Sequence, residues 1–176
     1  MKEHLDFKPV EECQDIVSES VYAVATGKGI LAGAINPEYM NGHALSDHYD
    51  IDPDNGVNCI IVRGKRGEDR VTAAVLVPVG YRADLNGLVC EKLNAKKVSM
   101  APLDDVIQES GMEYGSITPI GLPLSWKILI DSRLMEKETV IVGGGKQVSK
   151  LLVPMSVLAA LPNTEIVENL STRIPD

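Results

Sequence analysis

Residues 111–123 read GMEYGSITPIGLP and form the segment best suited to bind a ligand through its main chain. Its glycines permit backbone conformations that other residues resist, and Pro119 and Pro123 restrict φ. A stiff loop of this kind can aim N–H groups at a carbonyl or stabilise an oxyanion, with its Met, Tyr and Ile side chains as apolar lining. A tightly packed crossover loop is equally compatible with the composition, so the residues alone leave both interpretations open.

A second glycine cluster, GGGKQ at residues 143–147, follows an expected strand and ends in lysine and glutamine. Its spacing departs from the G-x-x-x-x-G-K-[ST] pattern of phosphate-binding loops, which favours a tight turn between two strands and argues against a nucleotide-phosphate protein. Glycines at a strand end still let a ligand approach the backbone closely. Gly144 is therefore kept as a candidate contact.

Other catalytic patterns are missing from the sequence. There is no G-x-S-x-G nucleophile elbow. His43 and His48 are five residues apart on one expected helix and do not share a face well, so His43 is only a spare candidate for a general base. The three cysteines are far apart and lack ligand spacing, which predicts reduced thiols and no zinc site: Cys13, Cys59 and Cys90.

Composition limits the classes of partner. The net charge of −8 argues against a broad basic surface that coats DNA or RNA, although it allows a small positive patch. The first ten residues lack the apolar core of a signal peptide, and the longest uncharged apolar run, residues 71–81, is too short to cross a bilayer. We therefore expect a cytoplasmic protein without a membrane partner.

The elements that must position these residues alternate between helices and strands. We expect a single domain over residues 1–176, of α/β class, with a mixed, partly antiparallel and barrel-like sheet flanked by helices. Helices are expected at residues 9–29, 36–48, 84–94, 102–110 and 154–161, and strands at 29–35, 57–62, 70–79, 96–101, 127–131, 139–144 and 149–154.

A charged hairpin tip is expected between the strands at 57–62 and 70–79. The intervening sequence RGKRGED and the residue after it carry charges of both signs. A solvated hairpin end is the favoured interpretation, and a contact with RNA phosphate is the weaker alternative. The charged residues are Arg63, Lys65, Arg66, Glu68, Asp69 and Arg70.

A family resemblance adds what periodicity cannot. The segment SGMEYGSITPIG resembles the pattern T-G-Y-x-x-G-G-[IV]-[ST]-P-[LF]-G of the YbaK / prolyl-tRNA synthetase-associated editing domain family. Three further blocks resemble that family in the same order, at residues 73–106, 127–134 and 140–161. No single motif is very specific, but the ordered set is, and the resemblance extends over about residues 34–170.

The resemblance implies a free-standing, trans-editing domain that hydrolyses the ester of a mischarged small amino acid on tRNA. Members of the family use a pocket rather than a serine nucleophile and need no metal or other cofactor. The implied partners are the acceptor end of an aminoacyl-tRNA and, as a further possibility, an aminoacyl-tRNA synthetase. This fits the logic of editing, because one pocket rejects a near-isosteric amino acid by only roughly 10–200-fold.

The chain departs from the family pattern at several positions. The family's loop has two adjacent glycines where this chain has Gly115 and Ser116. Its strand pattern V-x-K-[TS]-L corresponds to VNCIIV, in which we place Asn58 at the lysine position. Lys150 stands where many relatives have an acidic residue. Lys150 either takes over the missing charge or is a solvent-facing strand residue.

The resemblance assigns a mechanism with water as nucleophile and with the loop from Gly115 to Gly121 holding the aminoacyl carbonyl. A non-catalytic member that binds tRNA ends, a synthetase or an amino-acid-like ligand is the alternative, which the lost lysine and the acidic charge favour. The expected catalytic residues are Asn58, Gly115 and Lys150. The expected substrate contacts are Met112, Tyr114, Ser116, Thr118, Pro119, Ile120, Gly121, Gly144 and His43.

Overall fold

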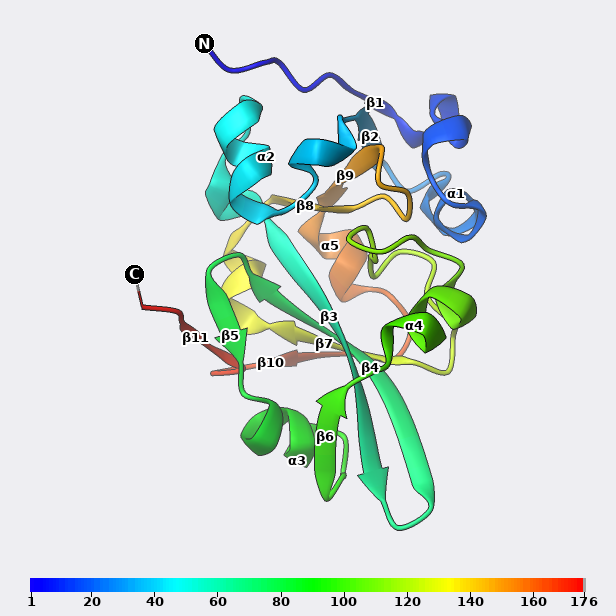
Figure 1. Cartoon of the computed structure of the whole chain (residues 1–176), viewed down its shortest axis with the longest axis vertical. Helices are drawn as coiled ribbons and strands as arrows, with labels where there is room; N and C mark the ends of the chain where they lie inside the picture. Colours follow the sequence, from blue (N-terminus) through cyan, green and yellow to red (C-terminus); the bar gives the residue numbers. More distant parts are fainter. Residues whose placement is uncertain (176) are drawn as a thin grey trace.

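The strands of the protein divide into two sheets and a short ribbon, as described for residues 1–175 by a computed structural model (Figure 1). The first sheet has four antiparallel strands in the order β1-β2-β9-β8. It pairs the N-terminal strands with strands that lie more than a hundred positions later in the chain. The strands are β1 (Phe7–Pro9), β2 (Leu31–Ala34), β9 (Ser149–Pro154) and β8 (Thr139–Gly143).

The second sheet has five strands in the order β10-β7-β4-β3-β6. The β10-β7 and β7-β4 pairs are parallel, whereas β4-β3 and β3-β6 are antiparallel, which confirms the predicted mixed sheet. An isolated bridge between Gly56 and Ile141 joins the two sheets. The strands are β10 (Thr164–Val167), β7 (Lys127–Asp131), β4 (Asp69–Pro78), β3 (Val57–Arg66) and β6 (Lys97–Met100); β11 (Ser171–Arg173) and β5 (Tyr81–Ala83) form the ribbon.

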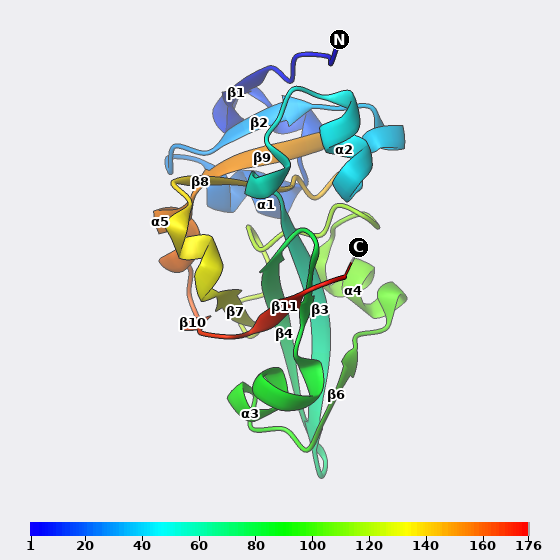
Figure 2. The ribbon, with the colours of Figure 1, turned by 90° about the vertical axis from the view of Figure 1, so that its left-hand side faces the viewer.

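The β3–β4 hairpin is longer than the sequence predicts. Most of the charged segment between the two expected strands continues the ladder, and the turn is confined to residues 67–68. Figures 1 and 2 show the hairpin projecting away from the four-stranded sheet, with β6 beside its lower half.

Short helices cover the sheets. Helix α4 ends at Gly111, which adopts the left-handed conformation (φ 71°) that glycine tolerates at a helix end. The segment expected to be a helix at 84–94 is a π-helical turn, Leu85–Val89, that continues into α3, and Asp84 accepts hydrogen bonds from its first amides. The helices are α1 (Glu19–Ala25), α2 (Gly42–His48), α3 (Cys90–Lys92), α4 (Leu103–Ser110) and α5 (Met155–Ala159).

Two predicted helices are interrupted. The helix expected at 9–29 is instead two 3₁₀ turns, Val10–Glu12 and Gln14–Ile16, followed by α1. Ser18 is extended and its hydroxyl accepts from the amide of Val21, so it begins a new helix in mid-segment. The helix expected at 36–48 likewise divides into a 3₁₀ turn, Pro37–Tyr39, and α2. The apolar spacing was therefore correct about burial but not about helix continuity.

The hydrophobic core has two main parts. One lies between the two sheets and includes Ile30, Leu76 and Leu151, and the other lies on the opposite face of the second sheet beneath α3 and includes Val62 and Leu129. Burying an aliphatic side chain of this size contributes about 1.5–3 kcal/mol. Within residues 1–175, no helix has the length and apolar character needed to cross a membrane.

Candidate functional site

A cavity of about 380 Å³ opens where the two sheets meet. Its floor is the first half of β3, and β8 and β9 contribute one wall. The loop after α4, the segment around α2 and the start of α4 close the other sides. Most of its lining side chains are aliphatic, and its titratable lining residues are Asp52, Cys59, Tyr114 and Lys150.

Among residues 1–175, Lys150 is the one cationic side chain that lines this cavity. It is 9% exposed, and its neighbours directly across the ladder on both sides are glycines, Gly33 and Gly143, which leave room beside its stem. Burial lowers the pKa of the Lys150 ammonium to about 8. No carboxylate among residues 1–175 forms an ion pair with it. The solvent-facing alternative is thus wrong, and the ammonium is free to meet an anionic or carbonyl oxygen.

The two glycine-rich segments of the sequence are joined to each other. The amide of Glu113 donates to the carbonyl of Gly145 (2.8 Å), and the amide of Gly145 donates to the carbonyl of Ser116 (2.9 Å). The amide of Gln147 donates to the Glu113 carboxylate (2.7 Å), and its side-chain amide donates to the carbonyl of Tyr114 (2.8 Å). The loop is therefore fixed against the turn at four points, which gives it the rigidity expected of a ligand-binding wall.

Gly115 lines the cavity, and both its backbone conformation and its close neighbours require glycine at this position. Its φ is +79°, and a Cβ atom there would lie 2.6 Å from the Cε of Met40. Its amide has no hydrogen-bond acceptor among the residues described. A second glycine supports this arrangement, because a Cβ on Gly143 would lie 2.7 Å from the carbonyl oxygen of Ser116. The close packing of the loop on β8 thus leaves one amide free beside the cavity.

Comparison with known proteins places this geometry in a family. The family model described as the aminoacyl-tRNA editing domain matches residues 37–161. The chain belongs to the aminoacyl-tRNA editing domain family.

Solved structures show the same fold. A candidate trans-editing enzyme for prolyl-tRNA synthetase superposes with a TM-score of 0.72 at 16% identity, over 86% of this chain and 97% of that one. The hypothetical protein APE2540 superposes with a TM-score of 0.69 at 20% identity, over 94% of this chain and 100% of that one. These likenesses confirm the editing-domain fold that the sequence predicts.

In this editing domain, the lysine position of the family's strand pattern falls on Cys59, although we expected it at Asn58. The pattern V-x-K begins at Val57, so its third position is Cys59, and the assignment of Asn58 is one residue out of register. Asn58 does reach the rim of the cavity, but it is exposed and stands opposite Val77, whose side chain packs on the far face of the sheet. Cys59 packs on the cavity side, where burial raises the pKa of its thiol to about 12.

Several predicted contacts of the editing domain lie away from the cavity. Of the loop, only Tyr114, Gly115 and Ile117 line it. The chain then turns into the core, where a Cβ on Gly121 would lie 2.6 Å from the main chain of Ser20. The predicted contacts that do not line the cavity are Met112, Ser116, Thr118, Pro119, Ile120 and Gly121, together with His43 on α2 and Gly144, where a Cβ would overlap the hydroxyl of Ser149.

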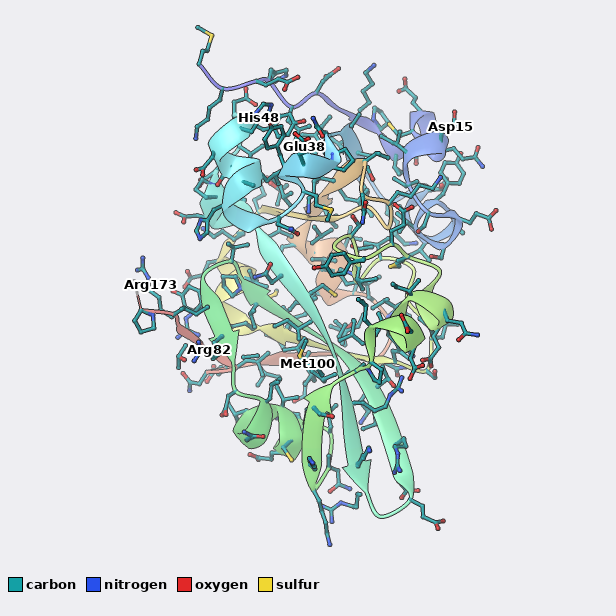
Figure 3. The ribbon with its side chains drawn as sticks, in the orientation of Figure 1. Asp15, Glu38, His48, Arg82, Met100 and Arg173 are labelled. Carbon is teal, nitrogen blue, oxygen red and sulfur yellow. The ribbon has the colours of Figure 1, made fainter. Side chains whose placement is uncertain are left out.

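Sequence reasoning missed the side of the cavity that belongs to α2 and α4. Met40 and Leu45 come from the segment around α2, and no motif marks them. Met100 and Leu103 are exposed at 60% and 46% and stand at the cavity with Tyr114, which is 56% exposed. Figure 3 places Met100 where β6 ends beside β3. Among residues 1–175, no three His, Cys, Asp or Glu side chains gather as a metal ion would require.

Proposed function

We propose that this editing domain acts in trans as an aminoacyl-tRNA deacylase, hydrolysing the ester between a wrong, small amino acid and the 3′ end of a tRNA. The observation that carries the proposal is the pairing of Lys150 with Gly115 in one cavity. Within residues 1–175, Lys150 is a buried ammonium without a carboxylate partner and Gly115 has an amide without an acceptor, and both residues line the same cavity. Ester hydrolysis builds negative charge on the carbonyl oxygen, and both groups stabilise negative charge.

The proposed roles follow from what each group can donate. The Gly115 amide donates to the aminoacyl carbonyl and then to the oxyanion that water forms by attacking it. The Lys150 ammonium neutralises the nearest anionic oxygen of the substrate, either that oxyanion or the phosphate of the terminal nucleotide. Removing one oxyanion donor typically costs about 10²–10³ in kcat. Water is the nucleophile, because within residues 1–175 no base activates a hydroxyl that lines the cavity, and the Cys59 thiol stays un-ionised near pH 7.

The cavity also supports the class of substrate. Its largely aliphatic lining and its volume of about 380 Å³ suit a small apolar amino acid with its ester group. An editing site of this kind supplies the second discrimination that a synthetase pocket alone cannot achieve. The partners would be the aminoacylated acceptor end and, by analogy with the structural neighbour named for prolyl-tRNA synthetase, a synthetase.

The test is a panel of mischarged tRNAs incubated with the purified protein, with release of labelled amino acid measured over time. We expect at least one small amino acid to be released faster than without protein, and Lys150→Met to reduce that rate. Lys28→Met is the matched control, because Lys28 is exposed. If no tRNA in a complete panel is deacylated above background, the protein is not a deacylase.

A non-catalytic role is the second candidate, favoured by Cys59. A neutral thiol stands where the family pattern has a lysine, so the usual cation on β3 is missing. Under this alternative the same cavity would bind an aminoacyl end without hydrolysing it. Spontaneous deacylation of the bound tRNA would then be slower than that of free tRNA, whereas the deacylase makes it faster.

A further inference from the structure

Three cations stand side by side across the β3–β4–β6 part of the second sheet. Lys65 on β3 pairs directly with Arg70 on β4 and with Lys97 on β6. Directly opposed residues project from the same face of a sheet, so the three side chains form one row, here called the cation row. All three are exposed.

The register explains why the sequence alone hides this row. The hairpin carries charges of both signs, but its acids lie elsewhere. Asp69 pairs with Arg66, one rung further along the ladder and therefore on the opposite face, and Glu68 lies in the turn. The face of the cation row is thus more basic than the sequence of the hairpin indicates.

No carboxylate in residues 1–175 forms an ion pair with Lys65, Arg70 or Lys97. The acids nearest along this face are already engaged, since Asp105 and Glu109 of α4 bind Arg63 at 3.1 and 3.0 Å. Like charges directly opposite one another destabilise a sheet. An unpaired row of three in a chain of net charge −8 therefore favours an anionic partner.

The cation row shares a sheet face with the cavity. Odd-numbered positions of β3 point to this face: Cys59 and Ile61 pack on the cavity side, and Lys65 follows them. Gly64 confirms the alternation, because a Cβ there would lie 3.0 Å from Ala95 on the other face. Lys65 is six residues beyond Cys59, which places it about 20 Å away along the strand.

We propose that the cation row binds the phosphate backbone of the tRNA acceptor arm while the aminoacylated 3′ end occupies the cavity. This inference rests on the proposed tRNA substrate but not on its hydrolysis. A nucleic acid presents regularly spaced phosphates over such a distance, and a straight row of three cations matches several of them at once. The row gives an acidic protein a local positive surface along one path to its cavity.

The test compares RNA binding by two triple variants. Lys65→Gln, Arg70→Gln and Lys97→Gln remove the cation row. Lys8→Gln, Lys28→Gln and Arg173→Gln remove the same charge from exposed positions away from it, and Figure 3 shows Arg173 far from the hairpin tip. The probe is a fluorescent tRNA acceptor-stem hairpin that ends in single-stranded CCA and carries no amino acid. The protein is titrated into it at KCl concentrations between 50 and 200 mM.

Wild type and the control variant should show the same salt slope, and the cation-row variant a slope lower by about 2.7, since each duplex phosphate contact contributes roughly 0.9. Over that salt range, wild type should lose roughly 40-fold more affinity than the cation-row variant. Equal slopes for the two triple variants would overturn the proposal, as would binding of anionic phosphatidylserine vesicles but not RNA. RNA binding that depends on the row, without any deacylation, would support the row and refute only the deacylase.

Discussion

Replacing Lys150 by methionine should make the protein more stable while it removes function. Burial lowers the pKa of Lys150 from 10.5 to about 8, and no carboxylate of residues 1–175 forms an ion pair with it, so the folded state holds a charged group at a cost. At about 1.36 kcal/mol per pKa unit, that cost reaches about 3 kcal/mol at pH 7. Methionine keeps an apolar stem of similar length and removes the charge.

The dependence on pH has a definite sign. Between pH 8 and 10.5 the unfolded chain holds the Lys150 proton and the folded chain does not, so wild-type stability rises with pH over this window. Lys150→Met lacks this titration. Its advantage should be largest below pH 8, at up to about 3 kcal/mol, and should shrink toward pH 10.5.

The assay is urea unfolding of wild type, Lys150→Met and the exposed control Lys28→Met at pH 7, 8, 9 and 10. Thermal unfolding of the same variants is the second readout, because an advantage of 3 kcal/mol corresponds to a rise in Tm of about 6–12 °C for a chain of this size. The difference between variants cancels the titration of the other lysines and tyrosines. If Lys150→Met and wild type have the same free energy of unfolding at every pH, the assignment of Lys150 as a buried, unpaired ammonium is wrong.

Other expectations concern the cavity. Gly115→Ala should lower kcat at least tenfold, because its Cβ would meet Met40 at 2.6 Å and its φ of +79° disfavours alanine; unchanged kinetics would remove the loop from the site. Wild-type deacylation, after subtraction of the rate without protein, should fall as pH rises through about 8, when Lys150 loses its charge; a corrected rate that rises would refute this role of the Lys150 charge. Cys59, with its pKa raised to about 12, should react with a thiol reagent more slowly in the folded protein than in the unfolded chain, as mass spectrometry would show. Asn58→Ala should change kcat/KM less than threefold, and a larger loss would restore Asn58 to the site.

Local signals in the sequence predicted much of the fold. The β3–β4 hairpin, α4 with Gly111 at its end, and the strand–turn–strand of β8 and β9 all follow from short-range patterns. The prediction of one continuous N-terminal helix was wrong, because Ser18 begins a new helix within an apolar repeat. Periodicity reports which residues are buried, and a chain that turns between short elements can bury the same residues as one continuous helix.

The site was less predictable because its residues are brought together by pairing between strands that lie far apart in the sequence. Lys150 is buried only because β9 lies between β2 and β8 with glycines on both sides, a register that no motif encodes. The loop was identified from its glycines and prolines, but only packing shows that Gly115 lines the cavity while Ile120 enters the core. Likewise, the sign of the charge on each face of the hairpin depends on cross-strand register.

The order of strands in the first sheet has a consequence for synthesis on the ribosome. β9 lies inside the first sheet, between β2 and β8. It follows its partner β2 by roughly 120 residues, so this inner strand is translated after the other three strands. At 5–20 residues per second, β2 waits between roughly 6 and 24 s for its partner. During that interval Lys150, which lies on β9, has not been translated, and the turn that fixes the loop at Glu113 has not emerged. A stalled chain that ends before β9 would carry the hairpin and its cations without a cavity.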